Sequence, residues 1–520
     1  MSTSLSTKMN YRNANQFVDT IVNGDANLYV YIGRPQPWDN ESVPDVPDDS
    51  LSTEYDVWHD MTAMKRVTAQ DIRLGFRRID WTINTAYDQY DDTANLNVLD
   101  FYVYTDEGKV YKCISNNAAA ESTIKPTQTT GTQVTSDGYK WKYMFTISDS
   151  LYRKFAVGDY LPIESDATVV ANAIVGSIDQ LVLESAGTGY TPSALASSNT
   201  ALPIYIYGDG NENATATCTI TVNSGIIQGV VVTNGGVNYS NPLESNVPVM
   251  IRQIGSTGAI ETAFGTATTN ADNEIINVDI VLGGSGYASG TAIIIQSSCQ
   301  GYAETNSIGV VTNVEISNGY AGTNFRVARA TVVDASITPA IVRPIISPFR
   351  GHGASPEREL LANYALVNLT FAYNEGADDF TVQNEFRRIG LIENPYTYGT
   401  TTIASAQTLN AKTTLVISNV SGTFSADDAI YGLTTGAKGI YVDTVDSTKL
   451  RFIKDDNTLS NNLDFTTEDI RSQSGATATI TEVINPEVEP YSGDILFINN
   501  TVAINRASDQ LETVTLVLEY

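Results

Sequence analysis

Residues Ile276 to Tyr287 read INVDIVLGGSGY, an apolar run that ends in a glycine-rich turn carrying an aromatic residue. The same order recurs at Ala186–Tyr190, Asn234–Tyr239 and Asn318–Tyr320. The tyrosines are spaced by 49, 48 and 33 residues, and most turns are followed by a second apolar run. Glycine supplies the positive φ of tight turns at low steric cost, and short apolar runs between turns are typical of strands. The pattern predicts a β-meander repeat array over residues 170–335, with a truncated last unit.

The composition of the chain indicates which partners to expect. Its 520 residues include 30 Lys and Arg against 59 Asp and Glu, a formal charge of −29. Free-standing nucleic-acid binders carry a basic face, and anionic membranes attract basic segments, so we expect neither partner. Only 17% of the residues are charged, against about 25% in an ordinary globular domain. Tyr (28) outnumbers Phe (15), which is the profile of a β-rich assembly protein with neutral polar faces.

The cysteines and the apolar runs indicate the compartment. Three cysteines without a CxxC pair argue against a disulfide scaffold and favour a reducing compartment. The longest apolar runs have five to seven residues, where a membrane-spanning helix needs about 20. The first ten residues lack the apolar segment of a signal peptide. We therefore expect a soluble protein that is synthesised in the cytoplasm.

The predicted fold is mainly β with an α+β N-terminal domain, arranged as several domains with β-sandwich or meander repeats. The N-terminal domain covers residues 1–169. Apolar residues at helical spacing predict helices over Asn10–Asn23, Asp60–Arg73 and Ser150–Phe155. An acidic, Pro-rich loop is expected at Asp39–Ser52.

The chain after the repeat array divides into three further segments. Residues 336–400 are predicted to form an α+β core segment, with a helix over Ser355–Ala365 that has Ser355 at its N-cap and a proline in its first turn. Residues 401–485 are predicted to be a small all-β module. Residues 486–520 are expected to be strands that return to the core, the last with its apolar residues on one face.

The sequence gives no pattern that requires catalysis. The only histidines are His59 and His352, and neither belongs to an HExxH motif or accompanies a GxSxG elbow. The acidic turns Asp209–Glu212 and Asp455–Asn457 do not continue as calcium loops, and the GSG at 284–286 belongs to the repeat array. We assign no catalytic, cofactor-binding or metal-binding residue and expect a protein that is not an enzyme. Paired carboxylates for sugar hydrolysis stay open, because 59 acids give many accidental pairs.

Three stretches together resemble one family. They are Tyr31–Trp38 (YIGRPQPW), followed by an acidic loop and Trp58; Asp137–Phe145 (DGYKWKYMF); and Ser492–Asn500 (SGDILFINN), followed by Asp509–Glu512 (DQLE). In this order they resemble the baseplate wedge subunit, of the protein-eight type, of T-even-type contractile-tailed bacteriophages. The run Asn384–Pro395 (NEFRRIGLIENP) is similar to longer versions of that subunit in marine relatives. The resemblance covers roughly the first 165 and the last 180 residues.

The resemblance implies a structural role in the virion, at the tail baseplate. It implies a homodimer that joins neighbouring wedge and hub-proximal tail proteins and takes part in the rearrangement that accompanies sheath contraction. No cofactor is implied. The repeat array at 170–335 departs from the shorter family members and reads as an insertion.

Several residues of these stretches are candidates for structural or interface contacts. Pro35 and Pro37 stiffen an extended segment that ends at Trp38, whose ring can anchor in a pocket. Arg34 of the same segment can donate two parallel hydrogen bonds to a carboxylate. The candidates are Arg34, Pro37, Trp38, Trp58, Trp141, Arg387, Arg388, Asp509 and Gln510. Two alternatives stay open: Trp38 packs internally, and the aromatic stripe that includes Trp141 belongs to a core.

Two other functions compete with a structural role. One is a tail adhesin that binds host glycans through the repeat tyrosines, such as Tyr239 and Tyr287. The other is a β-solenoid polysaccharide depolymerase with an acidic cleft.

Overall fold

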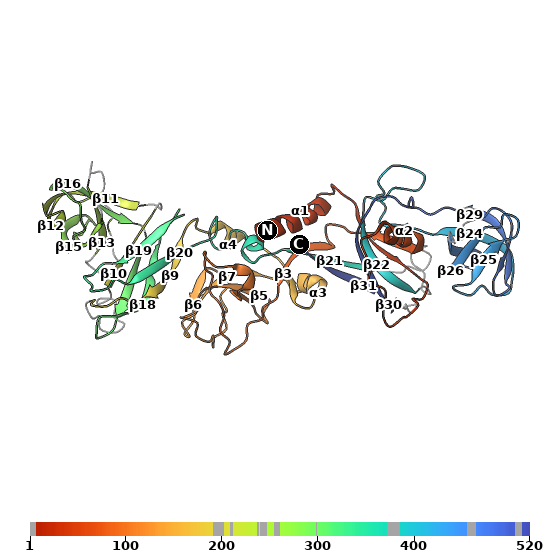
Figure 1. Ribbon diagram of the computed structural model, residues 1–520, viewed down its shortest axis with the longest axis horizontal. Coiled ribbons are helices and arrows are strands. Elements are labelled where there is room, and N and C mark those ends of the chain that lie inside the picture. Colours follow the sequence, from red (N-terminus) through yellow and green to blue (C-terminus); the bar gives the residue numbers. More distant parts are fainter. Residues whose placement is uncertain are drawn as a thin grey trace. The chain divides into compact units, whose positions relative to one another are not determined.

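The predicted fold class is confirmed, because 49% of the residues lie in strands and 10% in helices, distributed over several sheets. The structure is a computed structural model that describes residues 7–190, 202–208, 212–236, 239, 247–253, 261–297, 299–371, 385–454, 464–504 and 512–520. It separates into two compact units. The first contains residues 1–77, 150–162 and 362–520, and the second contains residues 78–149 and 163–361. Each unit therefore combines segments that are distant in the sequence (Figure 1).

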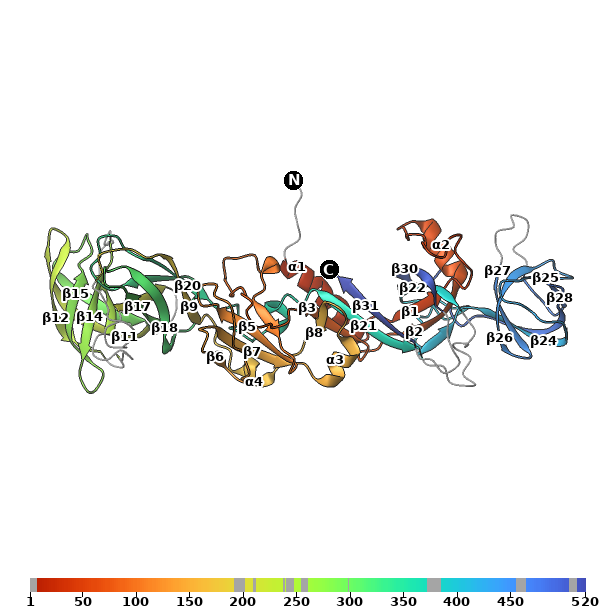
Figure 2. The same ribbon diagram turned by 90° about the horizontal axis from the view of Figure 1, so that it is seen from below.

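Two antiparallel sheets and a barrel build the first unit. The five-stranded sheet has the order β23 (Thr408–Asn410), β2 (Met61–Arg66), β1 (Leu28–Gly33), β22 (Phe386–Glu393) and β30 (Asp494–Ile504). The four-stranded sheet has the order β31 (Glu512–Glu519), β21 (Tyr364–Phe371), β3 (Ile72–Arg77) and β8 (Tyr160–Pro162). The two longest helices of the described chain, α1 (Thr7–Val22) and α2 (Leu51–Asp60), belong to this unit. Figure 2 shows α2 beside the five-stranded sheet.

The barrel of the first unit closes on itself (Figure 2). Its strands are β24 (Thr413–Ser421), β25 (Ala429–Gly432), β26 (Lys438–Asp446), β27 (Lys449–Lys454), β28 (Asp469–Ser472) and β29 (Thr477–Ile484). It lies within residues 401–485, where the sequence indicates a small all-β module. Alternating side chains such as Leu415, Phe452 and Ile480 fill its interior.

The second unit contains a four-stranded sheet and two six-stranded modules. The four-stranded sheet has the order β4 (Tyr102–Tyr104), β5 (Lys109–Ser115), β7 (Lys140–Thr146) and β6 (Thr132–Val134). Module one has the order β18 (Val311–Ala321), β17 (Cys299–Thr305), β10 (Leu202–Gly208), β19 (Ala328–Val332), β20 (Ile341–Ile346) and β9 (Ile178–Ser185). Module two has the order β12 (Ile226–Asn234), β11 (Glu212–Asn223), β16 (Gly290–Ser297), β13 (Val247–Gln253), β14 (Ala263–Thr269) and β15 (Ile275–Leu282). The short helices of this unit are η1 (Leu96–Val98), α4 (Ala167–Ala171) and α5 (Pro356–Glu359). The short helix α3 (Asp149–Phe155) belongs to the first unit from Ser150 onward.

The two modules have the same design. In each, a strand runs into a glycine turn whose aromatic residue donates its backbone N–H to a distant hairpin: Tyr190 to the Gly309 carbonyl, and Tyr287 to the Gly225 carbonyl. The two tyrosine hydroxyls also accept from equivalent backbone N–H groups, those of Ala340 and Ala263 respectively. The sheet orders match strand for strand when β9 is aligned with β15 and β10 with β16.

Module two is inserted into module one, and the two start at different strands. β10 and β17 are antiparallel neighbours, and residues 209–298 connect them. The inserted module begins and ends at residues that pair with each other, Glu212 and Ser297. Module one instead enters at β9 and leaves after β20, beside Ser177 and Ser347, which are joined by a backbone hydrogen bond. Module one is thus a circular permutation of module two.

The repeat tyrosines belong to the module cores. Tyr190, Tyr239 and Tyr287 are all buried, and each hydroxyl bonds to the backbone of its own module. A buried ring cannot stack on a sugar at the surface. The role in glycan binding that the sequence suggested for these tyrosines is therefore incompatible with their positions.

The sequence-based choice of the fourth glycine turn was wrong. Gly319 and Tyr320 lie inside β18, where the pairing with β17 is irregular. The true equivalent is Gly322–Phe325, because Phe325 is buried and donates its N–H to the Gly176 carbonyl, as Tyr239 does to Asn273. Gly187, Gly236, Gly284 and Gly322 share a φ of about 60°. A Cβ at Gly284 would lie 2.6 Å from the Glu261 carbonyl oxygen, so this turn requires glycine.

Two predicted helices were wrong or too long. The segment Asp60–Arg73 forms β2 and the start of β3, because Met61 and Met64 are used in pairing with β1 and packing in the core of the sheet. The helix of this region is α2, which begins next to the predicted loop and is capped by the Ser50 side chain. The helix predicted at Ser355–Ala365 is only α5, because Leu361 adopts a left-handed φ of 57° and the chain then enters β21.

Other local predictions are confirmed. α1 buries Ala14, Val18 and Ile21 on one face, as its helical spacing indicates. α3 coincides with the predicted helix at 150–155 within one residue. The terminal strand β31 is paired with β21 over its whole length. Among the described residues, no helix is both long and apolar enough to cross a membrane.

The insertion predicts that module two can be removed. We expect a chain in which a short Gly/Asn loop replaces residues 209–298 to keep module one, because β10 and β17 already lie next to each other. Tyr205 and Val333 lose the cover of Phe264 and are changed to Thr in the same chain. Circular dichroism and thermal unfolding should show retained strand content and a cooperative transition.

The matched control for this excision removes residues 299–321. That deletion takes β17 and β18 out of module one itself, so we expect insoluble protein. If the excised chain is as insoluble as this control, module one does not fold without its insertion.

Candidate functional site

Five of the predicted site residues lie in one cluster of the first unit: Arg34, Pro37, Trp38, Arg387 and Arg388. After β1 the chain turns at Arg34, whose φ is 55° and whose N–H bonds to the Asp60 carbonyl at 3.0 Å. Pro35 is buried and Pro37 is exposed. Trp38 then packs inside this chain with 6% of its surface exposed, and its indole N–H donates to the Thr501 carbonyl at 2.9 Å. Of the two positions considered for Trp38, the structure has the one in which its side chain packs within its own chain.

Two guanidinium groups lie over the Trp38 ring. The Arg34 Cζ is 4.1 Å and the Arg388 Cζ is 5.8 Å from the ring centroid. Arg388 also binds both carboxylate oxygens of Asp60 through Nη1, at 2.8 and 3.0 Å, and donates Nε to Asn500 Oδ1 at 2.9 Å. Cations over an indole face gain further when they are desolvated, as here. The result is a buried joint, which we call the Trp38 joint.

Arg387 fastens the loop that follows Trp38. Its guanidinium is 4% exposed and donates to Glu41 Oε1 at 2.8 Å, to Glu385 Oε2 at 2.7 Å and to the Pro35 carbonyl. Glu41 in turn accepts the Trp38 N–H at 2.9 Å. The guanidinium donors of arginine have a rigid, planar arrangement. The contacts of Arg387 with Pro35 and Glu41 therefore fix the position of the loop that follows β1.

The acid of the Trp38 joint has a perturbed pKa. Burial raises the pKa of Asp60 to about 6, although the Arg388 and Arg34 charges lower it. The Arg34 contact is longer, 3.7 Å between Nη1 and Oδ2. Burial likewise raises the pKa of the neighbouring Tyr31 hydroxyl. The hydrogen bonds and ion pairs of Asp60, Arg388 and Trp38 give the joint a fixed shape.

The remaining predicted residues lie elsewhere. Trp58 is buried at the end of α2, and its ring centroid is 6.3 Å from that of Tyr491. Trp141 is in the second unit, fully buried and stacked on Tyr139 at 5.3 Å, so it belongs to a core. Asp509 and Gln510 lie outside the described residues.

The structure contains a buried charge cluster that the sequence did not indicate. Lys112 on β5 is fully buried, with its Nζ 2.8 Å from Glu359 Oε2 and 3.9 Å from the Tyr90 ring centroid. His352 contacts the same ring edge-on at 5.1 Å. Its Nε2 is 3.9 Å from Asp179. Lys112 and Glu359 are 247 residues apart, so no local pattern could have paired them.

Burial, together with the ammonium groups around it, favours the neutral form of His352. Burial lowers the pKa of its imidazole well below the usual value, and the Lys112, Lys142 and Lys140 ammonium groups lower it further. Burial also lowers the pKa of Lys112, although Glu359 opposes this. The cluster fastens the segment around α5 to β5 and β7.

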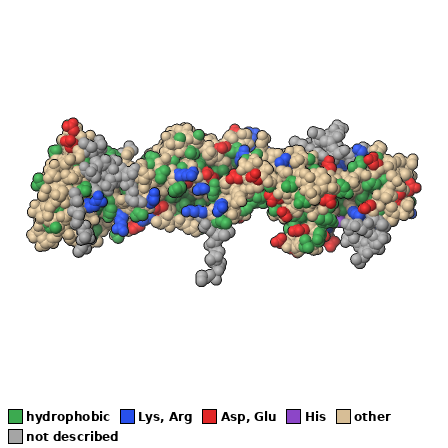
Figure 3. Space-filling view, turned by 90° about the horizontal axis from the view of Figure 1, so that it is seen from above, with side chains coloured by type: hydrophobic (Ala, Val, Ile, Leu, Met, Phe, Trp, Pro, Cys, Tyr) green, Lys and Arg blue, Asp and Glu red, His purple; other side chains and the backbone are tan. Residues whose placement is uncertain are grey.

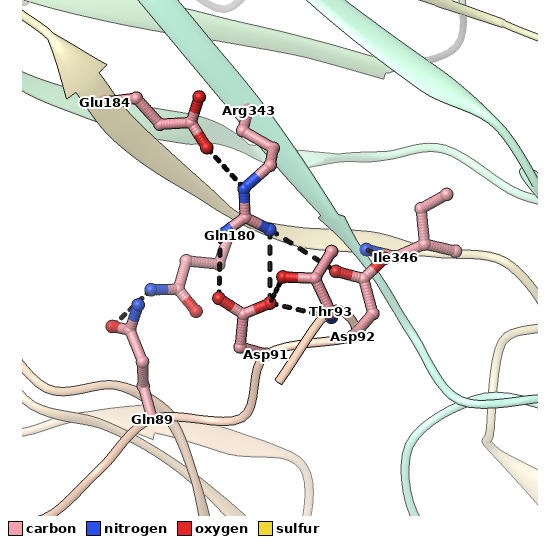
Figure 4. Close-up of polar contacts among 8 residues, drawn as sticks. All are labelled: Gln89, Asp91, Asp92, Thr93, Gln180, Glu184, Arg343 and Ile346. Carbon is pink, nitrogen blue, oxygen red and sulfur yellow. Dashed lines mark hydrogen bonds and ion pairs between the residues drawn. The ribbon is translucent and has the colours of Figure 1, made fainter. Parts of the chain in front are cut away.

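A second network holds the loop at residues 89–93 on module one (Figure 4). Arg343 of β20 binds Asp91 with two nitrogens, at 2.7 and 3.2 Å, and Glu184 of β9 with Nε at 2.7 Å. Burial raises the pKa of Asp91, but hydrogen bonds from Arg343 and Thr93 hold it below its usual value. Asp92 accepts the Ile346 N–H at 3.3 Å. The network aligns the loop with two strands at once.

The Trp38 joint predicts strong coupling between Arg388 and Asp60. Arg388→Met leaves the buried Asp60 carboxylate without its closest cation, and we expect a loss of about 3–5 kcal/mol in the free energy of unfolding at pH 7. The loss should shrink at pH 5, because the pKa of Asp60 is already about 6 and the carboxylate takes up a proton there. Urea unfolding followed by the ¹⁹F signal of fluorotryptophan at Trp38 measures it.

The control for this prediction is the double variant Arg388→Met/Asp60→Leu. It removes the orphaned charge, so it should recover much of the stability that the single variant loses. Additive losses in the two single variants would contradict a direct coupling.

The His352 cluster predicts a histidine that does not titrate. The chain has only two histidines, so ring NMR signals assigned with His352→Gln are simple to follow. We expect the His352 signal to stay in its neutral position between pH 8 and 5. Because the unfolded chain takes up a proton near pH 6.5 and the folded chain does not, acidification should lower the free energy of unfolding more in the native chain than in His352→Gln. Titration near pH 6.5 in the folded chain would contradict the placement.

The described residues contain no group of three or more His, Cys, Asp or Glu side chains that could hold a metal ion. Cys113, Cys218 and Cys299 are free thiols inside three different cores. Comparison with known proteins returns no matching protein-family model and no significant match among curated proteins.

Proposed function

We propose that this chain is a structural component of a contractile phage tail baseplate. In this role it acts as a wedge subunit that joins neighbouring subunits and takes part in the rearrangement that accompanies sheath contraction. Its expected partners are a second copy of itself and other wedge and hub-proximal tail proteins. Its location would be the virion.

One observation carries the proposal. Three of the four stretches on which the resemblance rests, Tyr31–Trp38, Asn384–Pro395 and Ser492–Asn500, contribute the neighbouring strands β1, β22 and β30. The fourth, Asp137–Phe145, contains most of β7 and belongs to the second unit. Arg34, Trp38 and Arg388 from two of these stretches then meet in the Trp38 joint, and Asn500 from the third binds Arg388. A resemblance by chance has no reason to select segments that pack together across more than 450 residues. This contact supports a shared architecture.

The internal bonding of the chain suits a mechanical role. Ion pairs join distant segments at three places: Arg388–Asp60 and Lys112–Glu359 are buried, and Arg343–Asp91 is half-buried. Removing either member of a buried pair is costly, so each joint resists sliding. A wedge subunit built in this way can keep its internal geometry while its contacts with neighbours change. Neutral polar β faces of the two modules would supply further contact area.

The proposal predicts that the purified chain self-associates and that it occupies the tail tip of an intact particle. Sedimentation velocity tests the first expectation. A cryo-electron map of the particle, into which the two modules and the barrel are fitted, tests the second.

Three outcomes would contradict the proposal. They are a chain that stays monomeric and ignores the other plate subunits, density for it in a fibre rather than in the plate, and release of reducing ends from host polysaccharide by the purified chain. The last outcome would favour a depolymerase, and binding on a glycan array would favour an adhesin.

A further inference from the structure

The loop before α2 and the outer side of α2 expose large apolar side chains. Val43 is 68%, Val46 90%, Leu51 62% and Tyr55 51% exposed. Tyr491 is 53% exposed and packs edge-on against Tyr55, with the ring centroids 5.5 Å apart. We call these five residues, with the acids around them, the acidic docking face. Four of the five lie within residues 43–55, and large exposed apolar groups that gather on a folded chain favour a contact site.

The charge of this face has one sign. Six exposed carboxylates alternate along the chain with these apolar residues, and from Pro35 to Met64 the chain has no Lys or Arg. They are Asp39, Asp45, Asp48, Asp49, Glu54 and Asp56. In the described part of the chain no ion pair neutralises them, whereas the nearby Glu41 and Asp60 are held by Arg387 and Arg388. Figure 3 shows carboxylate and hydrophobic side chains intermixed over this region.

The face is held in place at both ends. The Trp38 joint fixes its beginning through Glu41. Asn500 Nδ2 of β30 donates to the Asp45 carbonyl at 2.8 Å. At its end, Asp48 accepts from the Ser50 and Thr53 hydroxyls, and Ser50 caps α2. Because the loop is already ordered, a partner loses little free energy in fixing it.

We propose that the acidic docking face binds a basic segment of another protein, one that carries Lys or Arg beside apolar side chains. The apolar residues supply contact area, with Tyr55 and Leu51 as its anchors, and the six carboxylates select a cationic partner. A second copy of this chain is a poor occupant, because a two-fold contact here would set two identical acidic surfaces against each other. The inference rests on the proposed function and names the chemistry of one partner.

The test uses the purified full chain and a defined probe. The probe is a fluorescent amphipathic peptide of Leu and Lys, and its binding is measured by anisotropy at about 0.15 M salt, where long-range attraction is screened. Two further peptides carry Glu in place of Lys, or Ser in place of Leu. We expect the Leu/Lys peptide alone to bind well, and hydrogen exchange to show protection at α2.

Matched variants separate the docking face from the general negative charge of the chain. Val46→Ser/Asp49→Asn/Glu54→Gln changes one apolar residue and two acids of the face. Ile276→Ser/Asp272→Asn/Asp279→Asn makes the same changes at exposed positions on and beside β15 in the second unit. We expect the first variant to weaken binding by at least about tenfold and the second to change it less than about twofold.

Several results would overturn the inference. Equal weakening by the two variants would mean that the peptide senses only net charge. Protection away from α2, or unchanged binding after Val46→Ser/Leu51→Ser, would place the contact elsewhere. Loss of self-association in the docking-face variant would identify a second copy as the occupant. A failed peptide test combined with density at the tail tip would reject this partner while leaving the proposed function standing.

Discussion

The buried ion pair between Arg388 and Asp60 is the contact on which the first unit depends. Arg388 of this pair contacts the Trp38 ring. The pair links β22 to the start of β2, and both strands are neighbours of β1 in one sheet. A buried pair of this kind contributes less to net stability than to the choice of one arrangement, since each partner is costly to bury alone. In this chain the arrangement fixed in this way includes the strands β1, β22 and β30 and the loop that carries the acidic docking face.

In the second unit, the proximity of strand ends explains how one module is inserted into the other. A segment can be inserted into a folded sheet at low cost only where two strand ends already lie together, as at a hairpin. Module two enters module one between β10 and β17, and module one enters its unit between Ser177 and Ser347. The circular permutation of the two modules follows, since each opens its sheet at a different hairpin while keeping the same strand order.

Sequence patterns predicted the elements whose causes are local. They did not predict the elements and contacts that depend on residues far away in the sequence. The amphipathic spacing of α1 and the glycine turns before Tyr190, Tyr239 and Tyr287 could be read directly, because their causes lie within a few residues. The spacing of Met61 and Met64 fits a helix equally well, and pairing with β1, more than 25 residues away in sequence, decides for a strand. Phe325 was missed because its turn was sought as a tyrosine motif. Trp38, Arg387 and Arg388 were identified, but the acids that hold them were not.

Two groups of acids can be distinguished in this chain: acids that pair with a cation of the same chain, and the exposed acids of the docking face. The acids Asp60, Glu359 and Asp91 each have a cation within 3 Å, so their charges are neutralised by ion pairs within the chain. The six acids of the docking face have no such cation in the described structure, and their repulsion is tolerated because they are exposed and screened. An ordered loop that keeps both unpaired acids and uncovered apolar groups gains stability only when a basic, apolar surface covers it. The basic partner proposed for this face would cover both kinds of group, and its binding would stabilise this part of the fold.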